Sequence, residues 1–228
     1  MINISIEARM TSTRLPGKTL KLINQKPALE IMVDRVKKNK LANEVIVSTT
    51  INKEDNDIVN WCEKNNISYF RGSEHNVYDR VLKTHQKFNS DIIVELTGDC
   101  ILISAELIDH AIKLFLDNQY DYVNVSDPAT MGVQVYSIKT LESIKYKRKL
   151  KDEDKEHVTP YLYKSGKYKI FRTKMYTDLN CPKISFPLDT IEDWKVLDKI
   201  CKNFDNFDFS FKDIVEYIKK NPKIINLN

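Results

Sequence analysis

Short apolar segments of strand type alternate with amphipathic helical segments along the first half of this 228-residue chain, and this alternation restricts the fold more than any other feature. Apolar residues recur at every second position in the strand-type segments and every three or four positions in the helical ones. This order favours a mainly parallel central sheet with helices on both faces. The expected strands are residues 2–6, 44–48, 68–70, 91–96 and 122–125, and the expected helices are residues 27–40, 55–65, 77–88 and 105–115.

The regular alternation ends near residue 125. The expected elements beyond it are strands at 133–137 and 168–172 that pair antiparallel or leave the main sheet, a basic helix at 141–150, a segment at 184–188 that returns to the sheet, and closing helices at about 191–203 and 210–221. No internal repeat divides the chain. We predict one α/β domain over residues 1–228 with a mixed, mainly parallel, Rossmann-like sheet. A small inserted arm at about 127–182 would serve substrate binding or dimerisation.

The loop after the first expected strand has the composition of a phosphate-binding site. It holds Arg9, Arg14 and Lys18, with hydroxyl side chains and Gly17 between them. Open α/β sheets bind ligands at loops that leave the carboxyl ends of their strands. Cations, hydroxyls and backbone N–H groups together suit a polyphosphate better than a neutral ligand. The sequence therefore predicts a site for a nucleoside triphosphate.

This loop matches neither of the common glycine-rich phosphate patterns. Of the Walker pattern only Gly17-Lys18-Thr19 remains, and the glycines of the dinucleotide fingerprint are absent. Backbone groups can therefore cradle phosphates only in part, so the side-chain cations would supply most of the countercharge. The alternative interpretation is a solvated basic loop in which Pro16-Gly17 forms an ordinary turn.

Asp99 and Asp189 are the candidate metal ligands. Each follows a segment expected to be a strand, so both carboxylates would lie at the carboxyl edge of the sheet near the first loop. Mg²⁺ is commonly held in phosphoryl-transfer sites by one or two carboxylates together with substrate phosphates. In the alternative interpretation Asp99 is a turn residue, and Asp189 with Thr190 begins the following helix.

His157 and Arg172 could bind the acidic group of a second substrate. His157 lies in the segment Glu-His-Val-Thr-Pro-Tyr, and a lone histidine there could equally be structural. Tyr136 joins these two as a candidate for substrate binding. His75, His85 and His110 show no ligand spacing, and we interpret them as surface or packing residues.

Composition excludes several classes of protein. The net charge of +4 is small and evenly spread, so neither nucleic-acid nor membrane binding is expected. No apolar run approaches the roughly 20 residues of a membrane span. No leader-type segment precedes the first strand, so we expect a cytoplasmic protein. Cys62, Cys100, Cys181 and Cys201 show no C-x-x-C pairing, which favours reduced thiols.

Several segments along the chain match a known pattern. They are Ala8 to Lys18, Phe70 to Glu74 with Asp79-Arg80, Thr97 to Cys100, Glu156 to Tyr161, and Leu188 to Asp193. The first is highly specific, and the others gain weight from their order and spacing. In this order they resemble the cytidylyltransferases that activate acidic sugars. The likeness spans nearly the whole chain and is greatest to the branch of spore-coat polysaccharide biosynthesis protein F, related to the synthetases that load CMP onto 3-deoxy-octulosonate and sialic-type acids.

The resemblance implies a nucleotide-diphospho-sugar transferase-like fold, a homodimer, CTP as donor, Mg²⁺ as cofactor and a role in surface polysaccharide synthesis. An oxygen of an acidic small-molecule acceptor, either a sugar acid or a phosphate-bearing metabolite, would attack the α-phosphate of CTP and release pyrophosphate. By position, the implied catalytic residues are Arg14, Lys18 and Asp99. The implied nucleotide ligands are Ala8, Arg9, Arg14, Lys18, Arg71, Ser73 and Thr97, and the metal ligands are Asp99 and Asp189.

Some residues depart from the pattern of this branch. Glu7 stands where the branch usually has Gln, Gln134 stands where it often has Glu, and Ile101 and Ser104 replace an expected Pro and Asp. These departures concern the acceptor rather than the triphosphate cations.

Two other functions compete with this one. A glycosyltransferase of the same fold would need an Asp-x-Asp metal motif where this chain has Gly98-Asp99-Cys100. A catalytically inactive nucleotide-binding protein would be favoured by loss of Lys18, Asp99 or Asp189, and all three are present.

Overall fold

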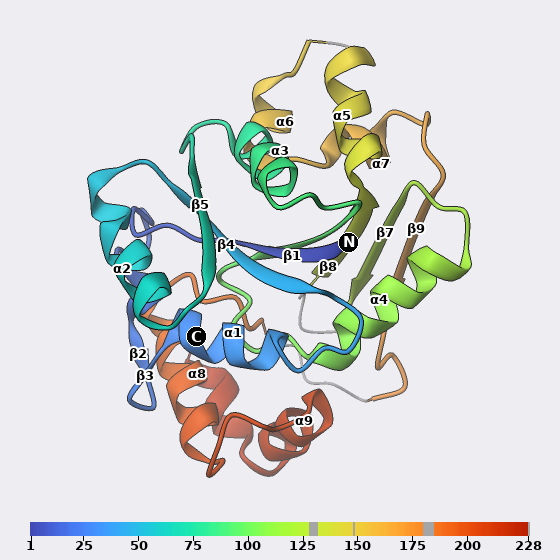
Figure 1. Ribbon diagram of the computed structural model, residues 1–228. Coiled ribbons are helices and arrows are strands. Elements are labelled where there is room, and N and C mark those ends of the chain that lie inside the picture. The colour runs from blue at the N-terminus through green and yellow to red at the C-terminus, as the bar shows by residue number, and fades with distance from the viewer. Residues whose placement is uncertain (128–131, 148, 180–184, 228) are drawn as a thin grey trace.

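A seven-stranded sheet forms the centre of the molecule (Figure 1). The computed structural model describes residues 1–127, 132–147, 149–179 and 185–227. The strands lie in the order β5-β4-β1-β6-β8-β7-β9. Their bounds are Ile2–Glu7 (β1), Glu44–Thr50 (β4), Ser68–Gly72 (β5), Ile92–Thr97 (β6), Tyr122–Ser126 (β7), Gly132–Ser137 (β8) and Ile170–Lys174 (β9).

The sheet is mixed but mainly parallel, as predicted. β1 pairs parallel with β4 and β6, and β4 pairs parallel with β5. β8 lies antiparallel between β6 and β7, and β9 pairs parallel with β7. Every strand of this sheet except β8 therefore runs in the direction of β1, and their carboxyl ends meet at one edge.

Helices cover both faces of the sheet (Figure 1). A small antiparallel pair, β2 (Leu22–Ile23) and β3 (Lys26–Pro27), precedes the first of them. The α-helices are α1 (Ala28–Val36), α2 (Asn56–Lys64), α3 (Val77–Lys87), α4 (Ala105–Asp117), α5 (Ile138–Lys147), α6 (Asp152–His157), α7 (Pro160–Lys164), α8 (Ile191–Lys202) and α9 (Phe211–Lys220). Short 3-10 helices occupy Lys18–Leu20, Lys53–Asp55 and Pro222–Leu227.

Each face of the sheet has its own apolar core. The larger core contains buried residues of α1, α2, α4, α8 and α9, with Ile4, Val94 and Val123 from the strands. The smaller core contains residues of α3, α5 and α7, with Ile93, Tyr122 and Tyr136 from the strands. Residues 93 and 94 belong to different cores because successive side chains of a strand point to opposite faces. The smaller core lies on the face that carries the cavity described below.

Helix boundaries follow the local chemistry of the sequence. The Asn76 side chain accepts a hydrogen bond from the Asp79 N–H and begins α3, and the Ser104 side chain does the same for α4 with the Leu107 N–H. Asn and Ser are among the residues that most favour this position at the start of a helix. α1 begins after Pro27 and ends at Val36, which is earlier than the predicted end at residue 40.

Two expectations for the second half of the chain were wrong, and one helix was not expected. The segment at 168–172 was expected to pair antiparallel or to leave the sheet, yet β9 pairs parallel with β7. Residues 185–188 form no strand, and residue 184 lies outside the described residues. α6, which ends at His157, forms in a segment for which no helix or strand was expected. Of the arm predicted at about 127–182, β8 and β9 lie in the main sheet, and α5, α6 and α7 stand outside it.

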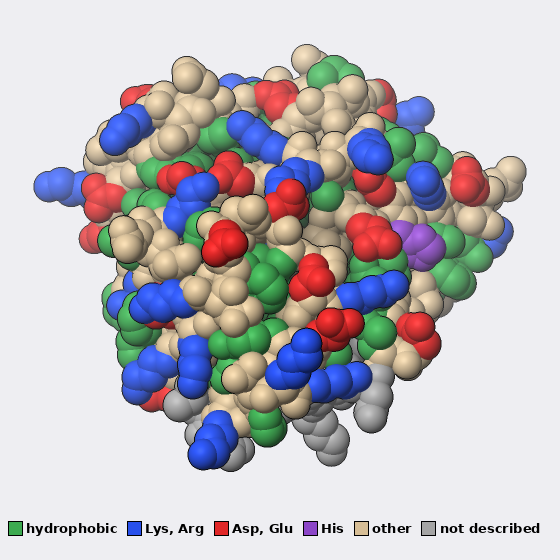
Figure 2. All heavy atoms as spheres, turned by 90° about the horizontal axis from the view of Figure 1, so that it is seen from below, with side chains coloured by type: hydrophobic (Ala, Val, Ile, Leu, Met, Phe, Trp, Pro, Cys, Tyr) green, Lys and Arg blue, Asp and Glu red, His purple; other side chains and the backbone are tan. Residues whose placement is uncertain are grey.

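Charge is mixed over the surface. Figure 2 shows basic and acidic side chains interspersed over the face seen from below, in keeping with the small net charge. None of the helices in the described part of the chain is long and apolar enough to cross a membrane. Cys62, Cys100 and Cys201 are buried free thiols, and Cys181 lies outside the described residues.

Candidate active site

The loop after β1 is held closed by its own backbone and by a buried carboxylate. The Gly17 N–H donates to the Met10 carbonyl at 2.9 Å, and Gly17 has φ 72°, a conformation that glycine adopts without strain. The Met10 N–H donates to Asp55 Oδ1 at 2.7 Å. Asp55 is completely buried and also accepts hydrogen bonds from the backbone and hydroxyl of Thr50. The loop is thus fixed to the end of β4 as well as to β1.

Glu74 supports the outer side of the same loop. Its carboxylate accepts a hydrogen bond from Thr11 Oγ1 at 2.7 Å and another from the Asn52 amide, and it forms an ion pair with Arg9 Nη1 at 3.3 Å. The hydrogen bonds from Thr11 and Asn52 are the main reason that the pKa of Glu74 is lowered. The Thr19 hydroxyl donates to the Arg9 carbonyl at 2.8 Å. Arg9 therefore has a fixed backbone and a half-exposed side chain.

Lys18, Asp99 and Asp189 meet at the inner side of the loop. Lys18 Nζ lies 2.8 Å from Asp189 Oδ1 and 3.7 Å from Asp99 Oδ2, and Arg14 Nη2 lies 2.9 Å from Asp189 Oδ2. The Leu188 N–H donates to the Asp99 carbonyl at 2.9 Å, so Asp189 reaches the sheet edge from an irregular segment rather than from the expected strand.

Gly98 permits the close approach of the two strand ends that form this corner. A Cβ atom at residue 98 would lie 2.6 Å from the Glu7 carbonyl oxygen, which is closer than real Cβ contacts allow. The Gly98 N–H donates to that same oxygen at 2.9 Å. The end of β6 is therefore pressed against the end of β1, and Asp99 follows directly.

A cavity of about 1390 Å³ extends from this corner across the sheet to α6 and α7. It is predominantly polar, and residues of α6 and α7 line it together with the loop after β1, here called the phosphate loop after its predicted role. Most of the predicted site residues line it together. They are Ala8, Arg9, Arg14, Lys18, Thr97, Asp99, His157, Arg172 and Asp189.

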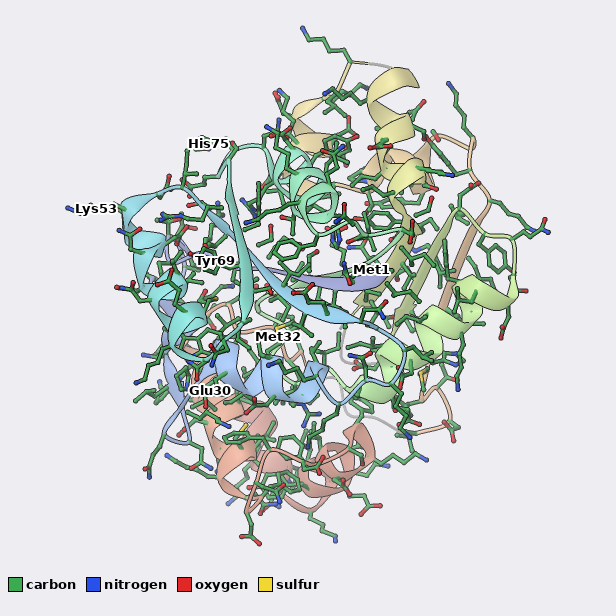
Figure 3. All side chains as sticks on the ribbon, viewed as in Figure 1. Met1, Glu30, Met32, Lys53, Tyr69 and His75 are labelled. Carbon is green, nitrogen blue, oxygen red and sulfur yellow. The ribbon has the colours of Figure 1, made fainter. Side chains whose placement is uncertain are left out.

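Arg71 and Ser73 line a smaller neighbouring pocket of about 430 Å³ instead. The Arg71 guanidinium donates to the carbonyls of Thr50 and Asn52, which fixes it against the loop after β4. Glu74 and His75 line both hollows, so the two are adjacent. Figure 3 shows His75 at the end of β5 on the same side of the molecule as Lys53, where β4 and β5 end.

Tyr136 lies beneath the cavity and does not line it. Its side chain is completely buried, and its hydroxyl donates to Glu95 Oε2. Any contribution of Tyr136 to substrate binding would therefore act through Glu95, which does line the cavity.

Glu7 and Glu95 also line the cavity. Glu95 was not predicted from the sequence, and Glu7 was noted only as a departure from the pattern of the branch. Burial and the nearby Glu95 carboxylate raise the pKa of Glu7 well above its ordinary value, and burial raises the pKa of Glu95 to about 7. The available signal was a charged residue inside the otherwise apolar strand at 92–96, where burial makes an acidic side chain costly. Arg80, Asn124, Gln134 and Thr159 also line the cavity without having been predicted to do so.

Asp99 and Asp189 fit a Mg²⁺ ion that takes its other ligands from a substrate. Both carboxylates approach the same Lys18 ammonium, so both can reach a common cation. Among the described residues no group of three or more His, Cys, Asp or Glu side chains could hold a metal. Two carboxylates with phosphate and water oxygens are a usual donor set for Mg²⁺, which rarely has an all-protein cage.

Comparison with known proteins identifies the family of this chain. The spore coat polysaccharide biosynthesis protein SpsF of Bacillus subtilis (strain 168) is 31% identical over 225 residues, covering 95% of this chain and 93% of SpsF. A cytidylyltransferase structure from Leptospira borgpetersenii serovar Hardjo-bovis (strain JB197) matches with a TM-score of 0.91 at 35% identity, covering 98% of this chain and 96% of that one.

A more distant structure has the same fold. CMP:2-keto-3-deoxy-manno-octonic acid synthetase, solved in complex with CTP, matches with a TM-score of 0.69 at 16% identity and covers 89% of this chain and 98% of its own. The cytidylyltransferase family model matches residues 4–220, which is nearly the whole chain. With its basic loop, its paired aspartates and this match, the chain belongs to the cytidylyltransferase family.

Proposed function

We propose that this protein transfers CMP from CTP to an acidic small-molecule acceptor and releases pyrophosphate. The observation that supports this most directly is the meeting of Arg14, Lys18, Asp99 and Asp189 at one end of the large polar cavity. Membership of the cytidylyltransferase family and the fold shared with a synthetase solved with CTP support the choice of nucleotide. The likeness to SpsF supports an acceptor from surface polysaccharide synthesis.

The basic side chains of the loop would bind the triphosphate. Lys18 is the most enclosed, with 16% of its side chain exposed, whereas Arg9 and Arg14 extend into solvent and can close over a ligand. Asp99 and Asp189 would hold Mg²⁺, which when bound neutralises charge on the phosphates. Lys18 and Arg14 both pair with Asp189, and Lys18 also lies near Asp99, so two cations face two carboxylates at this corner.

The acceptor would occupy the part of the cavity between the loop and the arm. His157 and Arg172 line this part and can donate hydrogen bonds to an acidic group. An acceptor oxygen would attack the α-phosphorus of CTP, and the bond from that phosphorus to the bridging oxygen of pyrophosphate would break. Lys18 and Arg14 lie where they can stabilise the departing charge, so positioning and electrostatics supply the catalysis.

Thermal unfolding with CTP, UTP, ATP and GTP, each with and without Mg²⁺, tests the donor. A ligand that binds only the native state at a hundredfold excess over Kd adds about 2.7 kcal/mol of stability. We expect a shift selective for CTP and enhanced by Mg²⁺, lost in Lys18→Ala and kept in Lys53→Ala, an exposed lysine outside the cavity. Stabilisation by a nucleotide diphosphate sugar alone would instead indicate a glycosyltransferase, and no shift with any nucleotide would contradict both.

A further inference from the structure

A row of polar side chains crosses the sheet beneath the cavity. In register, Ser5 of β1 faces Glu95 of β6, Glu95 faces Gln134 of β8, Gln134 faces Asn124 of β7, and Asn124 faces Arg172 of β9. Directly paired residues of neighbouring strands project from the same face of a sheet. All of them except Ser5 line the cavity. A face of this kind would ordinarily be apolar under its covering helices, so the polar row forms a floor suited to a polar ligand.

The end of this floor nearest the phosphate loop is acidic. Glu7 lies two residues beyond Ser5 on the same face of β1, and the Ser5 hydroxyl donates to Glu7 Oε1 at 2.8 Å. Glu7 Oε2 is enclosed and has no hydrogen-bond partner among the described residues. Glu95 is 3% exposed. The neighbouring guanidinium of Arg80 is also 3% exposed, and the described residues offer no partner to its Nε.

The charges at this end do not balance when both carboxyl groups are ionised. Glu7 and Glu95 face the cavity together, and Arg80 is the buried cation placed to interact with both. One enclosed negative charge is then left over, which is costly unless a proton or a cation compensates it. Burial and the neighbouring Glu95 carboxylate raise the pKa of Glu7, which shows that a second negative charge is unfavourable here.

The middle of the floor is neutral and its hydrogen-bonding direction is fixed. Gln134 Oε1 accepts hydrogen bonds from the Tyr122 hydroxyl at 2.8 Å and from the Thr159 hydroxyl at 2.6 Å. With its carbonyl oxygen held in this way, the Gln134 amide has its NH₂ group left to donate. Asn124 lies directly beside it in register.

The far end of the floor is basic. The Arg172 guanidinium lies 5.2 Å from the centre of the Tyr163 ring, a cation–π contact that holds it at the wall of the cavity. β6 and β9 are separated by β8 and β7, which places their backbones roughly 14 Å apart. The floor therefore runs from a negative to a positive end over the length of a small extended molecule.

We propose that the acceptor is zwitterionic, with an amino group bound by Glu7 and Glu95 and an acidic group bound by Arg172. This assignment rests on the proposed function, because it concerns the second substrate of the same site. A protonated amine supplies the positive charge that the acidic end lacks and donates to the enclosed oxygen of Glu7. A hydroxyl group in its place would donate a hydrogen bond and leave the charge uncompensated.

A matched pair of probes tests the amine. The dissociation constants of 8-aminooctanoate and 8-hydroxyoctanoate, which share chain length and carboxylate, would be measured by ligand-observed NMR in the full-length protein. We expect the amino compound to bind about tenfold more tightly, the gain typical of a hydrogen bond between charged groups. Glu7→Gln and Glu95→Gln should remove this preference, and Arg172→Gln should weaken both probes. Glu153→Gln removes a cavity-lining carboxylate paired with Lys164 and should preserve the preference.

Several outcomes would overturn the assignment. Equal binding of the two probes, or binding of neither, would mean that the floor does not select an amine. A preference that survives both glutamine substitutions, or one that Glu153→Gln removes equally well, would place the selectivity elsewhere. Competition between Mg²⁺ and 8-aminooctanoate that depends on Glu7 would make the pair a metal site. CTP stabilisation measured on the same samples is a separate readout, so its absence would reject the proposed donor without touching the probe result.

Discussion

Lys18 lies close to two carboxylates, so its replacement should raise the affinity for Mg²⁺ and lower turnover. Lys18→Ala leaves Asp99 and Asp189 facing each other without the ammonium between them. We expect tighter binding of Mg²⁺ to the ligand-free protein, measured by calorimetry, because the metal no longer competes with the lysine. Turnover with CTP should nonetheless fall by orders of magnitude, since the triphosphate loses its most enclosed cation. Weaker Mg²⁺ binding in the variant would contradict the interpretation that Lys18 and Mg²⁺ compete for the same two carboxylates.

Asp99→Asn should lower the catalytic rate and leave the stability of the fold nearly unchanged. The Asp99 side chain is a quarter exposed, and its ion-pair partner Lys18 keeps Asp189 in the variant, so the melting temperature should change little. Metal-dependent turnover should drop sharply because an amide is a much poorer ligand for Mg²⁺ than a carboxylate. Steady-state rates over a Mg²⁺ titration measure this effect. Full activity in the variant would remove Asp99 from the metal site.

Glu95 should make the stability of the protein depend on pH. Burial raises its folded-state pKa to about 7, above the ordinary value of 4.5 that applies in the unfolded chain. A raised pKa contributes stability at low pH, and this contribution is lost as pH rises from about 4.5 to about 7. Urea unfolding of the wild type and Glu95→Gln should therefore show the variant gaining relative stability across that interval. A difference that is constant with pH would mean that Glu95 titrates normally.

At the scale of single elements, the short helix at Lys53–Asp55 fixes the phosphate loop from outside. Asp55→Ala would leave the Met10 N–H and the Thr50 hydroxyl without their acceptor in a buried place. We expect a loss of roughly 2 kcal/mol in unfolding free energy and a weaker CTP-induced shift. Asp57→Ala, two residues away and exposed, is the matched control. Equal effects of the two substitutions would show that the anchor contributes nothing specific.

The elements that the sequence predicted well are those whose structure is decided locally. Asn76 and Ser104 begin their helices through hydrogen bonds that span three residues, and such caps are visible in the sequence. The strand at 92–96 is recognisable from its run of apolar residues. α6 is short and strongly charged, so it has no apolar periodicity to reveal it. Its position depends on packing against α3, which only the folded chain provides.

At the scale of the whole molecule, the order of the strands in the sheet could not be predicted from the sequence. The loop cations and Asp99 could be placed because they follow β1 and β6, which end at one sheet edge, whereas Asp189 reaches that edge from an irregular segment that was expected to be a strand. The polar floor could not, because it requires β8 to lie between β6 and β7 and β9 to lie beyond them. Glu95, Gln134, Asn124 and Arg172 come from four different strands and form one row only through that order.

The antiparallel strand β8 lies between two groups of parallel strands, and each group contributes different residues to the cavity. The strands on one side of it provide the phosphate loop and Asp99, and the strands on the other side provide Asn124 and Arg172. Changes to β7 and β9 would therefore alter the end of the cavity that is proposed to bind an acidic group, while the loop after β1 keeps its contacts with Asp55 and Glu74. Because Glu7 and Glu95 lie on β1 and β6, the proposed amine site is joined to that loop, so protein engineering could redesign only the acidic end separately.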